Sequence, residues 1–259
     1  AAADVEGVDS CGGFAAGRPA RRDYRPPVPT GGPTGTMEVL ARAPRAVRVA
    51  IRMHDLPLAA VVVSVWTYWF IVGAMSWRVR RRTRKLAGVV PEQKLEQAMW
   101  YVWVPLVAAW MALPMIAANG HVPHLSVPAW AREGAYGNVR GLGGVVAIVA
   151  LLATIECWKR MGRSWRMAVT PGEKTELVTT GLYRSIRHPI YALSILLMTA
   201  TAVVLPTVPM IAVALVHVTL MNLKARNEER HLLAMHGESY ASYLARTGRF
   251  LPRLFAPRA

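Results

Sequence analysis

The longest uncharged stretch of the chain, residues 190–223, constrains its fold most. These 34 residues contain no Asp, Glu, Lys or Arg. A single helix of this length would be about 51 Å long, whereas the hydrocarbon core of a bilayer is about 30 Å thick. Pro206 and Pro209 interrupt the stretch near its middle, and proline ends or kinks a helix. We therefore expect a helical hairpin, with arms over 190–205 and 208–223.

Three further apolar runs precede this hairpin. Residues 57–77 and 98–119 carry no charge and are each long enough to cross a bilayer, while 141–155 is shorter and ends at Glu156. Charged residues make up only 18% of the chain, against about 25% in typical soluble domains. The sequence predicts an all-α polytopic membrane protein with about five transmembrane helices. The last two form the hairpin, and a C-terminal cytoplasmic helical segment follows it.

The distribution of lysine and arginine predicts an orientation. Residues 78–97, 158–189 and 224–259 each carry seven of these cations, whereas 120–140 carries two and the hairpin turn none. Because positively charged loops stay in the cytoplasm, we expect the three rich segments there, in a bacterial-type inner (plasma) membrane. The eight arginines of residues 1–56 favour the opposite orientation.

The N-terminal segment, 1–53, differs from the membrane-embedded domain expected over 54–259. Its first 36 residues are rich in Gly, Pro, Ala and Arg, and they are too poor in large apolar side chains to form a core. We expect disorder there, with Met37 as an alternative start. Regularly spaced arginines in 38–53 predict a basic helix on the membrane surface. The net charge of +16 indicates contact with lipid headgroups rather than nucleic acid, because no soluble basic module is present.

The densest group of chemically capable side chains lies directly before the hairpin. Five of them fall within nine residues: Tyr183, Arg184, Arg187, His188 and Tyr191. Proline suits the first helical turn, so a helix is expected to begin at Pro189 with His188 at its N-terminal end. The free N–H groups and the dipole of that turn favour an anionic group nearby.

Paired carboxylates follow the hairpin. Glu228 shares a helical face with Lys224 by its spacing, and Glu229 shares another with Arg226. Alone, this pattern is typical of a solvated helix with internal ion pairs. A hairpin returns to the side that it left, however, so these residues must lie beside 175–191. Together the two segments predict a pocket at the cytoplasmic interface for a zwitterionic ligand.

These segments carry two blocks. Gly-Leu-Tyr-Arg-Ser-Ile-Arg-His-Pro-Ile-Tyr stands at 181–191, and Glu-Glu, followed by Gly-Glu-Ser-Tyr, stands within 228–240. In this arrangement the chain resembles the isoprenylcysteine carboxyl methyltransferase and phospholipid methyltransferase superfamily over about 175–252. The resemblance implies a membrane methyltransferase that uses S-adenosyl-L-methionine, with its cofactor-binding part in 158–252. The implied substrate is a lipophilic acceptor, such as a prenylcysteine-like carboxylate, at the cytoplasmic interface.

The resemblance also implies site residues. The family's substrate-side cation falls on Lys224, where arginine is commoner, and Arg226 is the alternative. With Glu229 these two are the candidate catalytic residues. No general base is expected, because a sulfonium methyl group is already activated and needs chiefly alignment. The implied cofactor lining consists of Thr175, Glu176, Leu177, Val178, Tyr183, Arg187, His188, Pro189, Ile190, Tyr191 and Glu228.

Other interpretations remain open. A membrane reductase of the sterol reductase type, which uses NADPH, has a similar hairpin and His-Pro-x-Tyr element, although the paired glutamates fit methyltransferases better. A phospholipid amine N-methyltransferase and a non-catalytic membrane protein are further alternatives. We expect the segment 162–167 at the rim of the site and His217 in a helix–helix hydrogen bond. The two cysteines, Cys11 and Cys157, indicate neither a disulfide framework nor a metal site.

Overall fold

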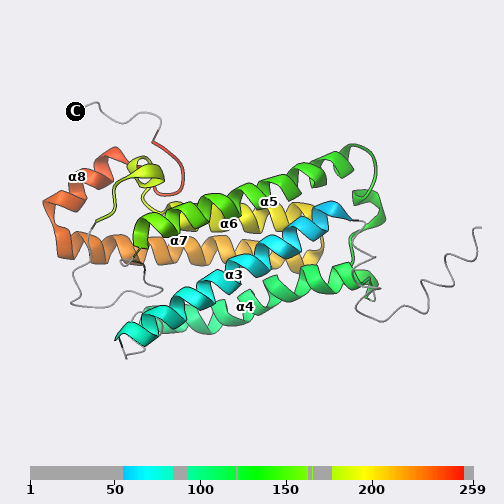
Figure 1. Ribbon diagram of the computed structural model, residues 1–259, viewed down its shortest axis with the longest axis horizontal. Coiled ribbons are helices and arrows are strands. Elements are labelled where there is room, and N and C mark those ends of the chain that lie inside the picture. Colours follow the sequence, from blue (N-terminus) through cyan, green and yellow to red (C-terminus); the bar gives the residue numbers. More distant parts are fainter. Residues whose placement is uncertain (1–54, 84–92, 121, 163–164, 166–176, 254–259) are drawn as a thin grey trace, which may run out of the picture. The chain divides into compact units, whose positions relative to one another are not determined.

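The computed structural model describes residues 55–83, 93–120, 122–162, 165 and 177–253 (Figure 1). The chain divides into two units, 1–43 and 44–259, and every described residue belongs to the second. The expected N-terminal segment, 1–53, with its disorder and its basic helix, therefore lies outside the described residues.

Within the described residues the secondary structure is helical, with no β-strand and one isolated bridge between Ile186 and Gly248. This confirms the all-α prediction. Three short 3-10 turns join the longer elements: η1 (Pro123–Leu125), η2 (Ala129–Ala131) and η4 (Gly181–Arg184). The α-helices are α3 (Leu56–Thr83), α4 (Lys94–Asn119), α5 (Gly134–Met161), α6 (Pro189–Val204), α7 (Val208–His236) and α8 (Glu238–Arg246).

Four of these helices, α3, α4, α5 and α7, are long and apolar enough to cross a membrane. The remaining expected span is the first arm of the hairpin. It corresponds to α6, which has only 16 residues. The hairpin itself is present, because α6 ends at Val204 and α7 begins at Val208, around the predicted proline-containing turn. Four helices therefore meet the length of a span, and α6 is apolar but shorter.

All four long helices extend beyond the apolar runs that predicted them, α5 and α7 by the most. Helix α5 begins at Gly134, well before 141–155, and α7 continues unbroken to His236, well past 208–223. The run 141–155 begins just after Arg140, whose charge suggests a boundary, but this side chain is buried inside the protein. The carboxylates Glu228 and Glu229 consequently stand on the second arm of the hairpin itself.

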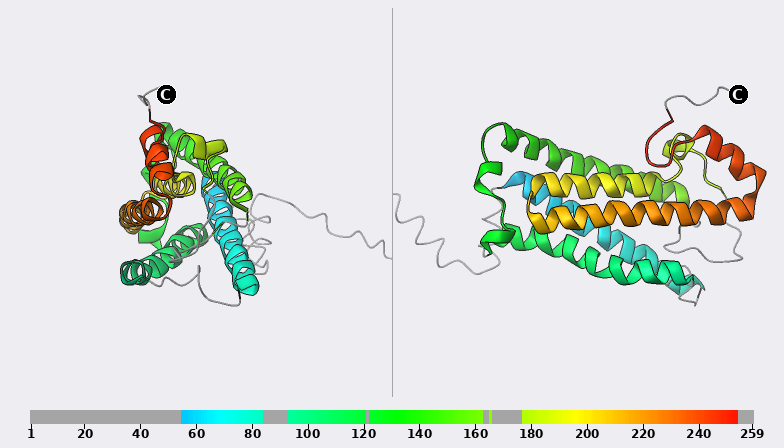
Figure 2. Two further views of the ribbon diagram at one scale, coloured as in Figure 1. Left: turned by 90° about the vertical axis from the view of Figure 1, so that its left-hand side faces the viewer. Right: turned by 180° about the vertical axis from the view of Figure 1, so that it is seen from behind.

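Glycines bring α5 close to its neighbours. A Cβ atom on Gly143 would lie 3.0 Å from Val204 Cγ2 of α6, and one on Gly144 would lie 3.0 Å from Pro57 Cα of α3. Small residues allow such close helix packing in membranes. Helix α5 thus packs on both α3 and α6, while α7 packs on α6 and α4 (Figure 2).

The C-terminal end of α6 is held by side chains of α5. Arg140 Nε donates to the carbonyl of Val204 at 2.8 Å, and the Tyr136 hydroxyl donates to the carbonyl of Val203 at 3.2 Å. The last carbonyls of a helix have no partner within the helix. These two bonds therefore give partners to the last carbonyls of α6, next to the hairpin turn in which Leu205 and Thr207 are buried.

Arg140 also forms an ion pair that fixes the start of α3. Its Nη2 lies 2.6 Å from Asp55 Oδ2, and Asp55 Oδ1 accepts a hydrogen bond from the Leu58 backbone N–H at 3.1 Å.

Asp55→Ala would leave the buried guanidinium without its counter-charge. We expect this change to lower the free energy of unfolding by about 1–3 kcal/mol, measured by chemical unfolding in detergent. Asp55→Asn, which retains the cap, should lose less, and equal losses in both variants would contradict this account.

Candidate active site

A glycine with a left-handed backbone conformation precedes the corner where α6 begins. Pro189 is the first residue of α6, as predicted, and His188 precedes it. Upstream, Gly181 has a φ of 64°, and a Cβ atom there would lie 2.7 Å from Arg160 Nε. The left-handed backbone therefore favours glycine at the first position of the 181–191 block, and a larger residue would also displace the partly exposed Arg160 side chain.

The hairpin brings the two predicted segments into contact. The Tyr191 hydroxyl donates to Glu228 Oε2 at 2.9 Å, and Arg187 Nε donates to Glu229 Oε1 at 3.0 Å. His188 Nδ1 lies 3.6 Å from Glu228 Oε2. Each glutamate thus accepts a hydrogen bond from a different residue of the 181–191 block, and His188 lies beside both.

Glu229 lies at the centre of a buried ionic cluster. Besides Arg187, its carboxylate accepts hydrogen bonds from Arg249 Nε at 3.1 Å and from Arg249 Nη2 at 2.6 Å. This hydrogen bonding raises the pKa of the Arg249 guanidinium. His188 Nε2 lies 3.3 Å from Glu229 Oε1 but makes no hydrogen bond in this orientation. Two guanidinium groups therefore balance one buried carboxylate.

The segment after α8 supports this corner from behind. The backbone N–H groups of Arg187 and His188 donate to the carbonyls of Gly248 at 2.8 Å and Arg249 at 3.1 Å. Gly248 N–H returns a bond of 3.0 Å to Ser185. Arg187 Nη1 donates to the carbonyls of Leu244 and Thr247. Arg187 thus binds residues 244–248, which we call the C-terminal segment, through both its side chain and its backbone N–H.

Helix α8 adds a further contact to the same corner. It follows Gly237 and buries Tyr240 and Tyr243. The Tyr243 hydroxyl donates to the Tyr183 carbonyl at 2.6 Å. Burial raises the pKa of Tyr243 to about 12, so this hydroxyl remains protonated, and able to donate, at neutral pH.

A pocket that encloses about 390 Å³, part of it open to solvent, lies at this corner, and we call it the polar pocket. His188 and Tyr191 are stacked in its wall, with ring centroids 5.4 Å apart and planes 3° apart. Glu228 brings a partly exposed carboxylate to the same wall. The remaining lining residues are Met161, Trp165, Tyr183, Arg187, Pro189 and Ile190.

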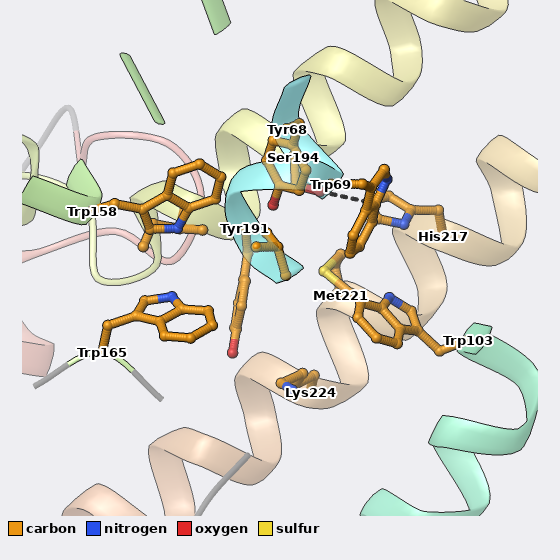
Figure 3. A pocket seen from close by; sticks show the side chains of 12 residues that line it. Tyr68, Trp69, Trp103, Trp158, Trp165, Tyr191, Ser194, His217, Met221 and Lys224 are labelled. Atoms are coloured by element: carbon orange, nitrogen blue, oxygen red, sulfur yellow. Dashed lines mark hydrogen bonds between the residues drawn. The ribbon is translucent and has the colours of Figure 1, made fainter. Parts of the chain in front are cut away.

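An aromatic pocket of about 510 Å³ adjoins it, and three residues, Trp165, Ile190 and Tyr191, line both. Figure 3 shows Tyr191 in the middle of the aromatic pocket and Lys224 at one end, with the hydrogen-bonded pair of Ser194 and His217 at the other. Ser194 Oγ lies 3.0 Å from His217 Nε2, which confirms the predicted helix–helix bond. The remaining lining residues are Tyr68, Trp69, Val72, Trp103, Trp158 and Met221.

The expected site residues fall into distinct places. Leu177 and Val178 are half-buried and line neither of these two pockets, and Thr175 and Glu176 lie outside the described residues. Of the candidate catalytic residues, Lys224 lines the aromatic pocket, Arg226 is exposed, and Glu229 is enclosed by its arginines. Seven expected cofactor-lining residues meet in the polar pocket: Tyr183, Arg187, His188, Pro189, Ile190, Tyr191 and Glu228.

Several site residues could not be identified from the sequence blocks. Arg249 stands twenty residues after Glu229, at a spacing that no helix pattern connects. Tyr68, Trp103 and Trp158 belong to apolar helices in which tryptophan and tyrosine also serve as interfacial anchors. The one available signal was the segment 162–167, expected at the rim, from which Trp165 lines both pockets.

The segment that contains the start of α6 and the two glutamates resembles a known protein family. Residues 143–234 match the model of the isoprenylcysteine carboxyl methyltransferase (ICMT) family, which confirms the resemblance for the segment from α5 to α7. A second similarity is to the nickel-cobalt-cadmium resistance protein NccN of Alcaligenes xylosoxydans xylosoxydans, with 33% identity over 95 residues. That alignment covers 36% of this chain and 45% of NccN, so the chain spans less than half of the relative's length.

Proposed function

We propose, from the match of residues 143–234 to the isoprenylcysteine carboxyl methyltransferase family, that this chain is a membrane methyltransferase dependent on S-adenosyl-L-methionine. It binds the cofactor in the polar pocket and a lipophilic acceptor in the aromatic pocket. The observation that carries this proposal is the adjacency of the two pockets, which share Trp165, Ile190 and Tyr191. A methyl group at this shared wall can face both compartments.

The polar pocket has groups complementary to the cofactor. The Glu228 carboxylate suits an ammonium group or ribose hydroxyls. The first-turn N–H groups of α6, beside Ile190 and Tyr191 in the lining, suit a carboxylate. The stacked rings of His188 and Tyr191 offer a flat surface beside these groups. Arg187 and Glu229 hold this wall in place through the C-terminal segment.

The chemistry requires little more than alignment and the exclusion of water. Bound S-adenosyl-L-methionine supplies a methyl group that is already activated for transfer. Tyr191 and Trp165 line both the polar and the aromatic pocket, and their rings make the wall between the two pockets largely apolar. Lys224 brings an ammonium group to the aromatic pocket, where the Glu96 and Glu228 carboxylates also interact with it. An ammonium group in the wall is complementary to an acidic group on the acceptor.

The proposed orientation places the site at the cytoplasmic surface. The C-terminal ends of α3, α5 and α7 lie at the end of the bundle where α6 begins, because the helices alternate in direction (Figure 1). The polar pocket lies at the start of α6. Residues 78–97, 158–189 and 224–259, which follow or include these ends, are the segments rich in lysine and arginine, as cytoplasmic segments are. Metal resistance, which the name of NccN describes, is not part of this proposal, because the alignment covers only 45% of that protein.

A titration of the full chain in detergent tests the proposed function. S-adenosylhomocysteine at a hundredfold excess over its Kd is expected to raise the unfolding temperature by about 5–10 °C, because it binds only the folded protein. NADPH and ATP should have no such effect. Stabilisation by NADPH alone would instead support a reductase, and no response to either ligand would support a non-catalytic protein.

A further inference from the structure

The aromatic pocket has walls from two different parts of the chain. Residues of α5, α6 and α7 belong to the segment 143–234 that matches the family model. The opposite wall consists of Tyr68, Trp69 and Val72 of α3 and Trp103 of α4, which lie outside that segment. Selection of the acceptor therefore depends in part on residues that the family match does not cover.

Three indole N–H groups in these walls lack a hydrogen-bond partner. They belong to Trp69, Trp103 and Trp158, and each nitrogen is buried. Buried indole N–H groups usually have a partner, and an exception calls for an explanation such as an absent ligand. Three such donors from three helices around one cavity indicate a ligand that carries hydrogen-bond acceptors. A plain hydrocarbon chain has none to offer.

The rings that carry these donors are held in fixed positions. The centroids of Trp69 and Trp103 lie 5.3 Å apart at an angle of 70°, and those of Tyr68 and Trp158 lie 5.0 Å apart. Figure 3 shows Trp158 and Trp103 on opposite sides of the cavity. Walls of flat, mutually packed rings are complementary to a flat ligand, because aromatic groups prefer stacked and edge-on contacts.

A smaller side pocket of about 320 Å³ continues from the aromatic pocket. Trp103, Met221 and Lys224 line both cavities. Helices α4 and α7 form the side pocket, and its remaining lining is Glu96, Met99, Trp100 and Leu220. Met side chains adapt to irregular shapes, so Met99 and Met221 can move to admit a flexible apolar substituent beside Leu220, in a wall that also carries the buried Glu96 carboxylate.

We propose that the acceptor is a flat aromatic or quinoid ring with an acidic hydroxyl group and an apolar side chain. The ring lies among the tryptophans, and its other oxygens accept hydrogen bonds from their N–H groups. The ionised hydroxyl faces Lys224, and the side chain enters the side pocket. This inference rests on the proposed function, and within it Trp103 is a specificity-determining residue at the junction of the two cavities.

The transfer that follows from this arrangement is balanced. The acidic hydroxyl loses its proton to solvent before the acceptor enters the pocket. The oxygen anion then forms a bond to the methyl carbon while the carbon–sulfur bond breaks and its electron pair remains on sulfur. The products are an aryl or quinoid methyl ether and S-adenosylhomocysteine.

Calorimetric titration of the detergent-solubilised full chain with lawsone, a flat naphthoquinone with an acidic hydroxyl group, tests this inference. Lawsone is expected to bind more tightly than the parent naphthoquinone without the hydroxyl and more tightly than N-acetyl-S-farnesylcysteine. Trp103→Phe keeps a ring but removes the N–H donor, so it should weaken lawsone binding about three- to tenfold. The matched control is Trp77→Phe on the exposed side of α3, which should bind lawsone unchanged.

S-adenosylhomocysteine binding, measured on the same samples, separates the possible failures. If it persists while lawsone does not bind, or while N-acetyl-S-farnesylcysteine binds as tightly, the inference is wrong and the proposed function stands. If lawsone binds as expected but S-adenosylhomocysteine does not, the methyltransferase proposal fails. Trp69→Phe replaces Trp103→Phe if the latter does not fold, and full lawsone affinity in a folded variant would contradict the role of these donors.

Discussion

Glu229→Ala is expected to lower the free energy of unfolding by about 3–5 kcal/mol, because it leaves two guanidinium groups of the site without their shared carboxylate. Arg187 and Arg249 both donate to Glu229, and Arg187 also holds the carbonyl of Leu244. Loss of the carboxylate should therefore release the C-terminal segment together with the wall of the polar pocket. Chemical unfolding in detergent measures the stability, and limited proteolysis detects the release.

The matched control for this change is Glu238→Gln, which removes an exposed carboxylate from the first turn of α8. It should cost no more than about 1 kcal/mol. Glu229 acts in this account as a positioning residue, since it holds other residues and touches neither of the two pockets. A Glu229→Ala protein with wild-type stability but no S-adenosylhomocysteine binding would show instead that the carboxylate contacts the ligand.

Glu228→Gln should have the opposite profile. The amide retains an oxygen that can accept from the Tyr191 hydroxyl, so the unfolding temperature without ligand should hardly change. The negative charge in the polar pocket is lost, and hydrogen bonds to charged groups contribute about 1.5–3 kcal/mol. We therefore expect the affinity for S-adenosylhomocysteine to fall about 10- to 100-fold, measured by calorimetric titration.

Tyr191→Phe serves as the comparison, because it removes the hydroxyl that binds Glu228 but leaves the carboxylate in the pocket wall. Its loss of affinity should be smaller than that of Glu228→Gln. Unchanged affinity in Glu228→Gln would exclude this carboxylate from cofactor recognition and with it the assignment of the polar pocket.

The fold was predictable where a local property decides it. Long uncharged runs become membrane-length helices, and proline positions set the start of α6 at Pro189 and the hairpin turn before α7. The start of α5 was not predictable from charge. Arg140 suggests an interface, but it is buried by its bonds to Asp55 and Val204, which are distant in sequence. A charge at the edge of an apolar run marks a boundary only when no partner reaches it.

The site shows the same division. The segments that contact each other through the hairpin, with Tyr191 on Glu228 and Arg187 on Glu229, follow from topology, because both arms end at the same side. The aromatic pocket depends on the way in which α3 and α4 pack against the hairpin, and no local pattern records that packing. Arg249 likewise reaches Glu229 only because the chain folds back after α8. The two sequence blocks therefore contain seven of the residues that line the polar pocket, whereas most of the residues that line the aromatic pocket lie outside them.

The short first arm of the hairpin has a consequence for the surrounding lipid. At 16 residues α6 spans about 24 Å, some 6 Å less than typical hydrocarbon. Its polar end at His188 belongs at the headgroup level, so this hydrophobic mismatch falls on the turn at Leu205, which Arg140 and Tyr136 shield through the carbonyls of α6. We therefore expect the hairpin turn to end below the opposite membrane surface, and we expect the protein to respond to bilayer thickness.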